Sequence, residues 1–217
     1  MISTKSLLRI FILLSIIYLS CILFNSATWV FYLKPLLLLP LIVAVSISTN
    51  FKNKNILLCA LAFSWFGDIL LLFVFKNAIF FILGLIAFLT AHIFYIFLFI
   101  KEIKKASGKI EIRKGLILIA IYLSTILLFL IPHLGGLTIP VIIYAVVIST
   151  MLYIAYLLSF YLAKPTSIYL LTGAISFILS DSILAFDKFY QPVPMSGFLI
   201  MATYLYAQLA LVKSCIG

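Results

Sequence analysis

Residues 78–100 read AIFFILGLIAFLTAHIFYIFLFI, a run without a charged side chain. A helix needs about 20 apolar residues to cross the hydrocarbon core of a bilayer, so this run predicts a membrane-spanning helix. The rest of the chain has the same character: 66% of its 217 residues are hydrophobic, 9% are charged, and the mean hydropathy is +1.36. A soluble domain is about half apolar and about a quarter charged. The composition therefore excludes a soluble globular protein.

The same criterion predicts eight spans in an all-α, polytopic membrane protein. They lie near Leu7–Phe24, Pro35–Thr49, Ile56–Phe75, Ala78–Ile100, Gly115–Ile131, Leu137–Leu162, Ile168–Phe186 and Met195–Val212. The connections are short and leave no room for a soluble domain. We therefore expect one integral membrane domain over residues 1–217.

The positive charges predict the orientation of these spans. With eight spans, the termini and the even-numbered loops share one face of the membrane. That face holds twelve of the fifteen basic residues: Lys5, Arg9, Lys52, Lys54, Lys101, Lys104, Lys105, Lys109, Arg113, Lys114, Lys164 and Lys213. The other face holds Lys34, Lys76 and Lys188. Cytoplasmic loops carry the excess of Lys and Arg, so both termini are predicted to be cytoplasmic.

Three further expectations follow from the charge and composition. The net charge of +10 flanks apolar runs instead of forming one patch, so we expect no nucleic-acid partner. The chain is rich in Ile, Phe and Lys, as proteins of AT-rich bacterial genomes are, which favours a bacterial inner (cell) membrane. Lys5 and Arg9 before an apolar run also fit a signal peptide, although the run is long for one.

Two stretches of the chain resemble each other. Residues 64–73 read SWFGDILLLF and residues 177–186 read FILSDSILAF, which places Asp68 and Asp181 at matching positions. Gly84 and Gly197 have the same separation. Four spans per half would keep two repeats parallel, with halves at residues 1–105 and 106–217.

Asp68 and Asp181 are the candidate catalytic residues. An ionised carboxylate inside the bilayer costs about 2.5–3.5 kcal/mol, so an acidic residue there is a functional candidate by default. Counted by helical rise, each lies about 9–10 Å from the outer end of its predicted span. The alternative is structural, since a buried Asp can cap a broken helix or bond a neighbouring Ser.

Other polar residues are candidates for binding or supporting roles: Lys34 opens the second predicted span at the outer face, and the others fall at helical spacing within their spans. The candidates are Lys34, His92, Tyr95, Ser180, Tyr204 and Gln208. Each has a structural reading as well: Lys34 could snorkel to the interface, and His92 on its own is better explained as bonded to a neighbouring helix. The three cysteines lie singly in apolar surroundings, where they behave as small hydrophobes. No metal site and no cofactor are expected.

These residues together resemble the YhhN family, which contains the lysoplasmalogenases. The resemblance rests on Lys34-Pro35-Leu36, Gly67-Asp68, the series Gly84, Leu85, Phe88, His92 and Tyr95, the series Gly173, Ala174, Phe177, Ser180, Asp181, Leu184 and Ala185, and the pair Tyr204 and Gln208. It implies an eight-span membrane enzyme that hydrolyses the vinyl ether bond of lysoplasmalogens to a fatty aldehyde and glycerophosphoethanolamine or glycerophosphocholine. The family's two acidic positions correspond to Asp68 and Asp181.

The residues agree with that chemistry and leave an alternative open. Vinyl ether hydrolysis needs a neutral acid to protonate carbon and a negative charge to stabilise the resulting oxocarbenium ion. Two carboxyl groups divide such roles in glycosidases. The substrate would be a lysophospholipid held among membrane lipids, with its phosphate near Lys34. The alternative is a proton-coupled or lipid transporter that uses the same aspartates. The oligomeric state does not follow from the sequence.

Overall fold

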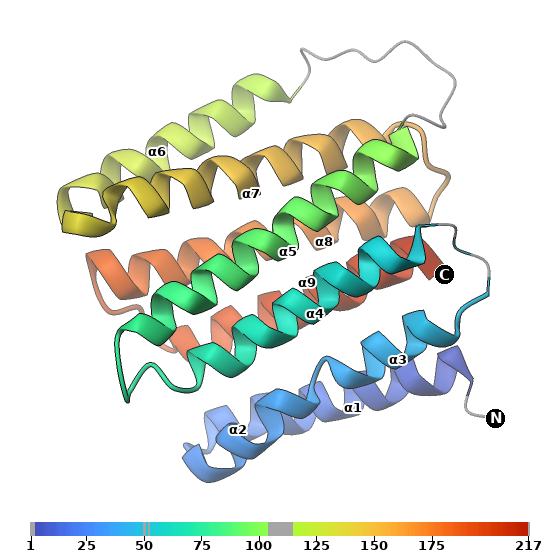
Figure 1. Cartoon of the computed structure of the whole chain (residues 1–217), viewed down its shortest axis with the longest axis horizontal. Helices are drawn as coiled ribbons and strands as arrows, with labels where there is room; N and C mark the ends of the chain where they lie inside the picture. Colours follow the sequence, from blue (N-terminus) through green and yellow to red (C-terminus); the bar gives the residue numbers. More distant parts are fainter. Residues whose placement is uncertain (1–2, 50, 52, 104–114, 217) are drawn as a thin grey trace. The chain divides into compact units, whose positions relative to one another are not determined.

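The computed structural model describes residues 3–49, 51, 53–103 and 115–216, and every regular element in these ranges is helical (Figure 1). The predicted all-α class is therefore confirmed. Six of the basic residues behind the predicted orientation lie outside the described residues: Lys52, Lys104, Lys105, Lys109, Arg113 and Lys114. The helices form two compact units. The first contains the described residues up to Leu98 together with Cys215 and Ile216, and the second contains those from Phe99 to Ser214.

The first unit begins with a long helix that packs against a broken one. Its elements are α1 (Thr4–Leu23), α2 (Ala27–Leu33), the 3₁₀ turn η1 (Lys34–Leu36), α3 (Leu39–Ile47), α4 (Lys54–Leu71) and most of α5 (Ile79–Ile103). Helix α1 contacts both α2 and α3, while η1 and α3 contact α4. Figure 1 shows α2 and α3 as one interrupted path beside α1.

The interruption between α2 and α3 changes the predicted second span. The span begins at Ala27 instead of Pro35 and runs to Ile47. Proline has no backbone N–H to donate within a helix, and Pro35 and Pro40 both lie at this break. As a result Lys34 lies inside the span, where the prediction had placed it at the outer face.

Helices α4 and α5 approach closely at two glycines. A Cβ atom on Gly67 would lie 2.7 Å from the ring of Phe88, and one on Gly84 would lie 2.8 Å from Leu71. Small residues of this kind let membrane helices pack backbone against backbone. The glycine before Asp68 therefore fixes how α4 meets α5.

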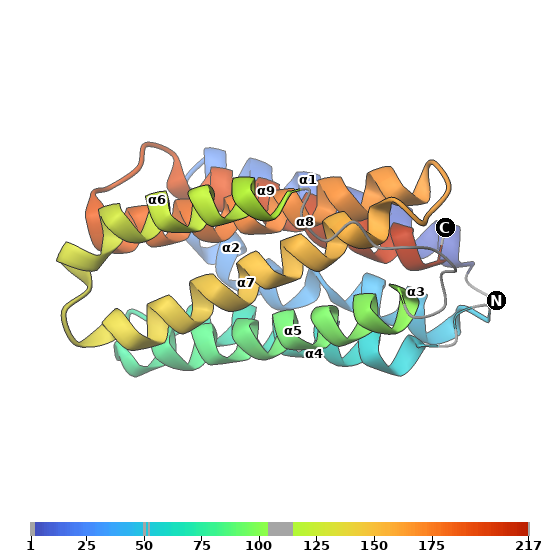
Figure 2. The same ribbon diagram turned by 90° about the horizontal axis from the view of Figure 1, so that it is seen from above.

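The second unit is built around α7. Its elements are α6 (Leu116–Leu134), the 3₁₀ turn η2 (Gly135–Leu137), α7 (Thr138–Ser159), α8 (Thr166–Ala185), the π-helical segment η3 (Phe186–Tyr190) and α9 (Ser196–Ile216) up to Ser214. Helix α7 packs against both α6 and α8. Figure 2 shows α6 and α7 joined by the short turn at η2. Gly135, at φ +52°, ends α6 there.

Seven helical segments among the described residues are long and apolar enough to cross a membrane. One of them, Leu116–Ser159, has 44 residues and contains α6, η2 and α7, so it covers two of the eight predicted spans. Large apolar side chains face outward on these helices, such as Leu118 and Leu128 on α6. Such exposure is expected where the surrounding solvent is lipid. The chain is a multi-pass membrane protein.

Candidate active site

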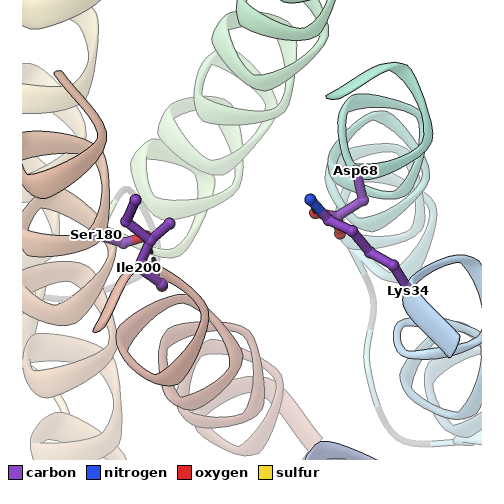
Figure 3. A network of polar contacts seen from close by, with 4 residues as sticks. All are labelled: Lys34, Asp68, Ser180 and Ile200. Atoms are coloured by element: carbon purple, nitrogen blue, oxygen red, sulfur yellow. Dashed lines mark hydrogen bonds and ion pairs between the residues drawn. The ribbon is translucent and has the colours of Figure 1, made fainter. Parts of the chain in front are cut away.

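Asp68 lies near the end of α4 and is 2% exposed. The Nζ atom of Lys34, at the start of η1, lies 4.0 Å from its Oδ1 atom (Figure 3). The indole Nε1 of Trp65, one turn earlier on α4, donates a hydrogen bond of 2.6 Å to the carbonyl oxygen of Pro35. This bond ties η1 to the face of α4 that carries Asp68. The first unit therefore holds an ammonium group beside a buried carboxylate.

The ion pair gives Lys34 an anionic partner within the protein. Its side chain is only 13% exposed, and a buried pair of opposite charges loses hydration on both sides. The structure thus places Lys34 beside one candidate catalytic residue. The predicted contact of Lys34 with a substrate phosphate stays a prediction.

Asp181 lies near the end of α8 and is half-buried. The phenol oxygen of Tyr144, on α7, donates a hydrogen bond of 2.5 Å to its Oδ2 atom. Tyr144 was missed in the sequence because a tyrosine in an apolar span is ordinary. The available signal was weaker: a buried tyrosine hydroxyl usually finds a polar partner, and Asp181 is one of the few acidic groups it could reach.

A cavity of about 40 Å³ adjoins Asp181 in the second unit. Its polar lining consists of Tyr122, Tyr144, Ser149, Asp181 and Ser182, and the remaining lining is aliphatic. The hydroxyl groups of Tyr122 and Ser182 share a short hydrogen bond. Helices α6, α7 and α8 each contribute to this lining. None of these residues except Asp181 was singled out from the sequence.

The predicted supporting residues on α8 and α9 mainly join those two helices. The Ser180 hydroxyl donates a hydrogen bond of 2.9 Å to the carbonyl oxygen of Ile200 (Figure 3). The rings of Phe177 and Tyr204 pack edge to face with centroids 5.6 Å apart. Gln208 is fully buried one turn further along α9. Ser180 and Tyr204 therefore hold α9 against the helix that carries Asp181.

His92 and Tyr95 are fully buried on α5. The Nδ1 atom of His92 lies 2.5 Å from the carbonyl oxygen of Phe88, and a ring N–H there donates to it. This partner lies in the same helix, one turn back. Such a bond fixes the orientation of the imidazole ring. Among the described residues, no group of three or more His, Cys, Asp and Glu side chains could hold a metal ion.

Each unit thus supplies one carboxyl group with a defined polar partner: an ammonium group for Asp68 and a phenol for Asp181. Carboxyl groups inside apolar helices can hold charge or transfer protons. The fold and these residues define a polytopic α-helical membrane protein with a carboxyl group on an apolar helix of each unit. The sequence model of the YhhN family matches residues 28–215, and the chain belongs to that family.

Relatives with curated names point to one activity. The chain is 35% identical over 141 residues to the human protein named lysoplasmalogenase TMEM86B, a match covering 63% of this chain and 54% of that relative. It is 32% identical over 161 residues to the bovine protein named lysoplasmalogenase TMEM86A, covering 72% and 63%. The chain therefore spans between about half and two thirds of the length of these relatives. No solved structure matches it.

Proposed function

We propose that this protein is a lysoplasmalogenase, a membrane hydrolase that cleaves the vinyl ether bond of lysoplasmalogens. The products are a fatty aldehyde and glycerophosphoethanolamine or glycerophosphocholine. Family membership and the names of the relatives support the substrate class. The apolar helices offer a surface for the single chain of a lysolipid, which enters from the surrounding membrane.

Asp68 and Asp181 carry the chemistry in this proposal. The reaction needs a neutral acid that protonates the vinyl carbon and an anion that stabilises the oxocarbenium ion. Opposite charge stabilises an ionised carboxylate, and the Lys34 ammonium lies 4.0 Å from Asp68. We therefore assign the anionic role to Asp68. We assign the role of proton donor to Asp181, which accepts a hydrogen bond from the Tyr144 phenol.

The observation that carries the proposal is this difference in partners. Two carboxyl groups in equivalent surroundings would favour the same protonation state. A carboxyl group in an ion pair and one bonded to a phenol have different surroundings, which supports different roles. The charged role of Asp68 and the neutral role of Asp181 are inferred from their partners Lys34 and Tyr144.

We also propose eight membrane crossings with both termini in the cytoplasm of a bacterial cell. Helices α6 and α7 have 19 and 22 residues, which by helical rise is about 28 and 33 Å, each enough for one crossing. A reporter at Gly136 should then report the outer side, and reporters after Gly108 and at the C-terminus should report the cytoplasm. Gly108 lies outside the described residues. A cytoplasmic signal at Gly136 would contradict the eighth crossing.

The experiment that tests the proposed activity is an aldehyde assay on the purified protein in detergent. A lysoplasmalogen substrate should release a fatty aldehyde, and two matched controls should not: the saturated alkyl ether lysolipid and the acyl lysophospholipid. Only the first has the carbon–carbon double bond that an acid can protonate. Transport needs two compartments, so aldehyde release in detergent also separates hydrolysis from the transporter alternative. Absence of aldehyde from active-site-intact, folded protein would reject the proposal.

A further inference from the structure

The cavity beside Asp181 contains a buried hydroxyl group with no hydrogen-bond partner. Ser149, on α7, is 3% exposed and lines the cavity, and its Oγ atom has no partner among the described residues. Leaving a buried hydroxyl unbonded costs about 1–3 kcal/mol. The neighbouring Thr150 hydroxyl instead donates to the carbonyl oxygen of Val146, one turn back on the same helix. Ser149 is therefore positioned to bond something inside the cavity.

The other polar groups of the cavity present acceptor atoms to the same space. The Ser182 hydroxyl donates to the carbonyl oxygen of Ile178 at 2.5 Å, so Tyr122 must donate to Ser182 in the bond that they share. The Tyr144 hydroxyl likewise donates its hydrogen bond to Asp181. Both phenol oxygens then retain lone pairs. A ligand here must donate hydrogen bonds to phenol oxygens and also satisfy the Ser149 hydroxyl.

The size of the cavity limits what that ligand can be. A single water molecule needs roughly 10–15 Å³ of such volume and two to four polar partners. The cavity has about 40 Å³, and its polar lining offers that number of partners. Its lining among the described residues includes no Lys or Arg, so it offers no cation to a lipid phosphate. Water fits in volume, and it both donates and accepts hydrogen bonds as the lining requires.

We propose that this cavity binds the water molecule that vinyl ether hydrolysis consumes, with Ser149 and Tyr122 orienting it beside Asp181. The inference rests on the proposed function. Asp181 transfers its proton to the vinyl carbon that is not bonded to oxygen, a C–H bond forms there, and the π electrons move to give the oxocarbenium ion. The water oxygen then bonds to the cationic carbon and its proton passes to the Asp181 carboxylate. The resulting hemiacetal releases the glycerol oxygen with a proton, leaving the aldehyde.

The two steps can be separated by working in D₂O. If protonation proceeds but water is missing, the oxocarbenium ion loses a hydron and returns to vinyl ether, so recovered substrate gains deuterium at the vinyl carbon. The useful variant is Ser149→Val, which removes the hydroxyl and adds apolar volume to the wall of the cavity. Ser149→Ala is a milder second variant that removes only the hydroxyl. Thr150→Val is the matched control, because it removes an exposed hydroxyl from the next position of α7.

We expect Ser149→Ala to slow aldehyde release about tenfold, the effect of one lost hydrogen bond to a positioned group, with KM unchanged. Ser149→Val should slow it further, and both variants should show a higher ratio of deuterium in recovered substrate to aldehyde formed. Thr150→Val should match wild type in both measurements. The ratio does not depend on the amount of folded protein, so poor folding alone cannot raise it.

Each other outcome has a definite meaning. If wild type releases no aldehyde, the proposed function fails and this inference fails with it. If wild type is active and both Ser149 variants hydrolyse at the wild-type rate without exchange, the water site alone is rejected. Folded Ser149 variants that lose hydrolysis and show no exchange also reject it, because Ser149 would then act before the water step. If Ser149→Val does not fold, Ser149→Ala decides.

Discussion

Asp68 and Asp181 occupy corresponding places in the two units of the molecule. Each lies near the end of its α-helix, since α4 ends at Leu71 and α8 ends at Ala185. Each has a polar partner on the candidate membrane span before its own helix: Lys34, within Ala27–Ile47, in one unit and Tyr144 of α7 in the other. These two partners differ in charge, because Lys34 is a cation and Tyr144 a phenol.

The residue before each aspartate also has a corresponding role. Gly67 lets α4 pack tightly against Phe88 of α5, and Ser180 bonds α8 to Ile200 of α9. In both units this position joins the aspartate helix to the helix that follows it. The partners do not align residue by residue, because Lys34 precedes Asp68 by 34 positions and Tyr144 precedes Asp181 by 37. The proposed duplication stays a prediction, and the difference in partners shows where the two halves would have diverged.

The largest expected effect comes from removing either carboxyl group. Asp68→Asn and Asp181→Asn should each lower kcat for lysoplasmalogen roughly 10²- to 10⁴-fold, the usual value of an acid–base group. Asp187→Asn is the matched control, because the Asp187 Oδ1 atom only accepts a backbone hydrogen bond from Val193, which an amide oxygen can also accept. Near-normal hydrolysis by Asp68→Asn or Asp181→Asn would contradict the catalytic role assigned to that residue.

The next effect is on stability and should be confined to the first unit. Lys34→Met leaves the buried Asp68 carboxylate without its cation, a change that typically costs about 3–5 kcal/mol. The double variant Lys34→Met/Asp68→Asn removes both charges and should recover most of that loss, while remaining inactive. Thermal unfolding in detergent measures both. An unchanged melting temperature for Lys34→Met would mean that the pair contributes nothing to folding.

A smaller effect is expected for the partner in the second unit. Tyr144→Phe removes the hydrogen bond that would stabilise the Asp181 carboxylate formed when Asp181 gives up its proton. A hydrogen bond to a charged group is worth about 1.5–3 kcal/mol, so kcat should fall about ten- to hundredfold. The melting temperature should change less than in Lys34→Met, since no charge is left unpaired. Tyr156→Phe, a tyrosine of α7 whose ring packs on Phe160, is the control. Equal losses of activity in Tyr144→Phe and Tyr156→Phe would show that the Tyr144 hydroxyl has no specific role in catalysis.

The smallest effect concerns helix packing beside Asp68. Gly67→Ala would place a Cβ atom 2.7 Å from the Phe88 ring. The ring must shift, at a cost of about 1 kcal/mol, the low end of the range for overpacked cores. Gly136→Ala is the control, because nothing lies within 4 Å of its Cβ position. The two melting temperatures should differ, with Gly67→Ala the lower.

The helices and the two aspartates could be predicted from the sequence, because apolar length and buried charge are properties of single segments. The start of the second span was wrong, since Trp29 and Tyr32 dilute the apolar run before Pro35. The pairing of Lys34 with Asp68 could not be predicted, because it depends on the break at η1 and on the rotation of α4. Tyr144 and Ser149 were missed for the same reason: their role comes from the helices packed against them.

The central claim is that this protein breaks a vinyl ether by protonating carbon. The most direct measurement is the mass of the aldehyde released from lysoplasmalogen by the purified protein in D₂O, trapped as it forms. The account predicts one deuterium on the carbon next to the carbonyl group, and no aldehyde above background from Asp181→Asn. An aldehyde without deuterium, or equal labelled aldehyde from Asp181→Asn, would contradict it.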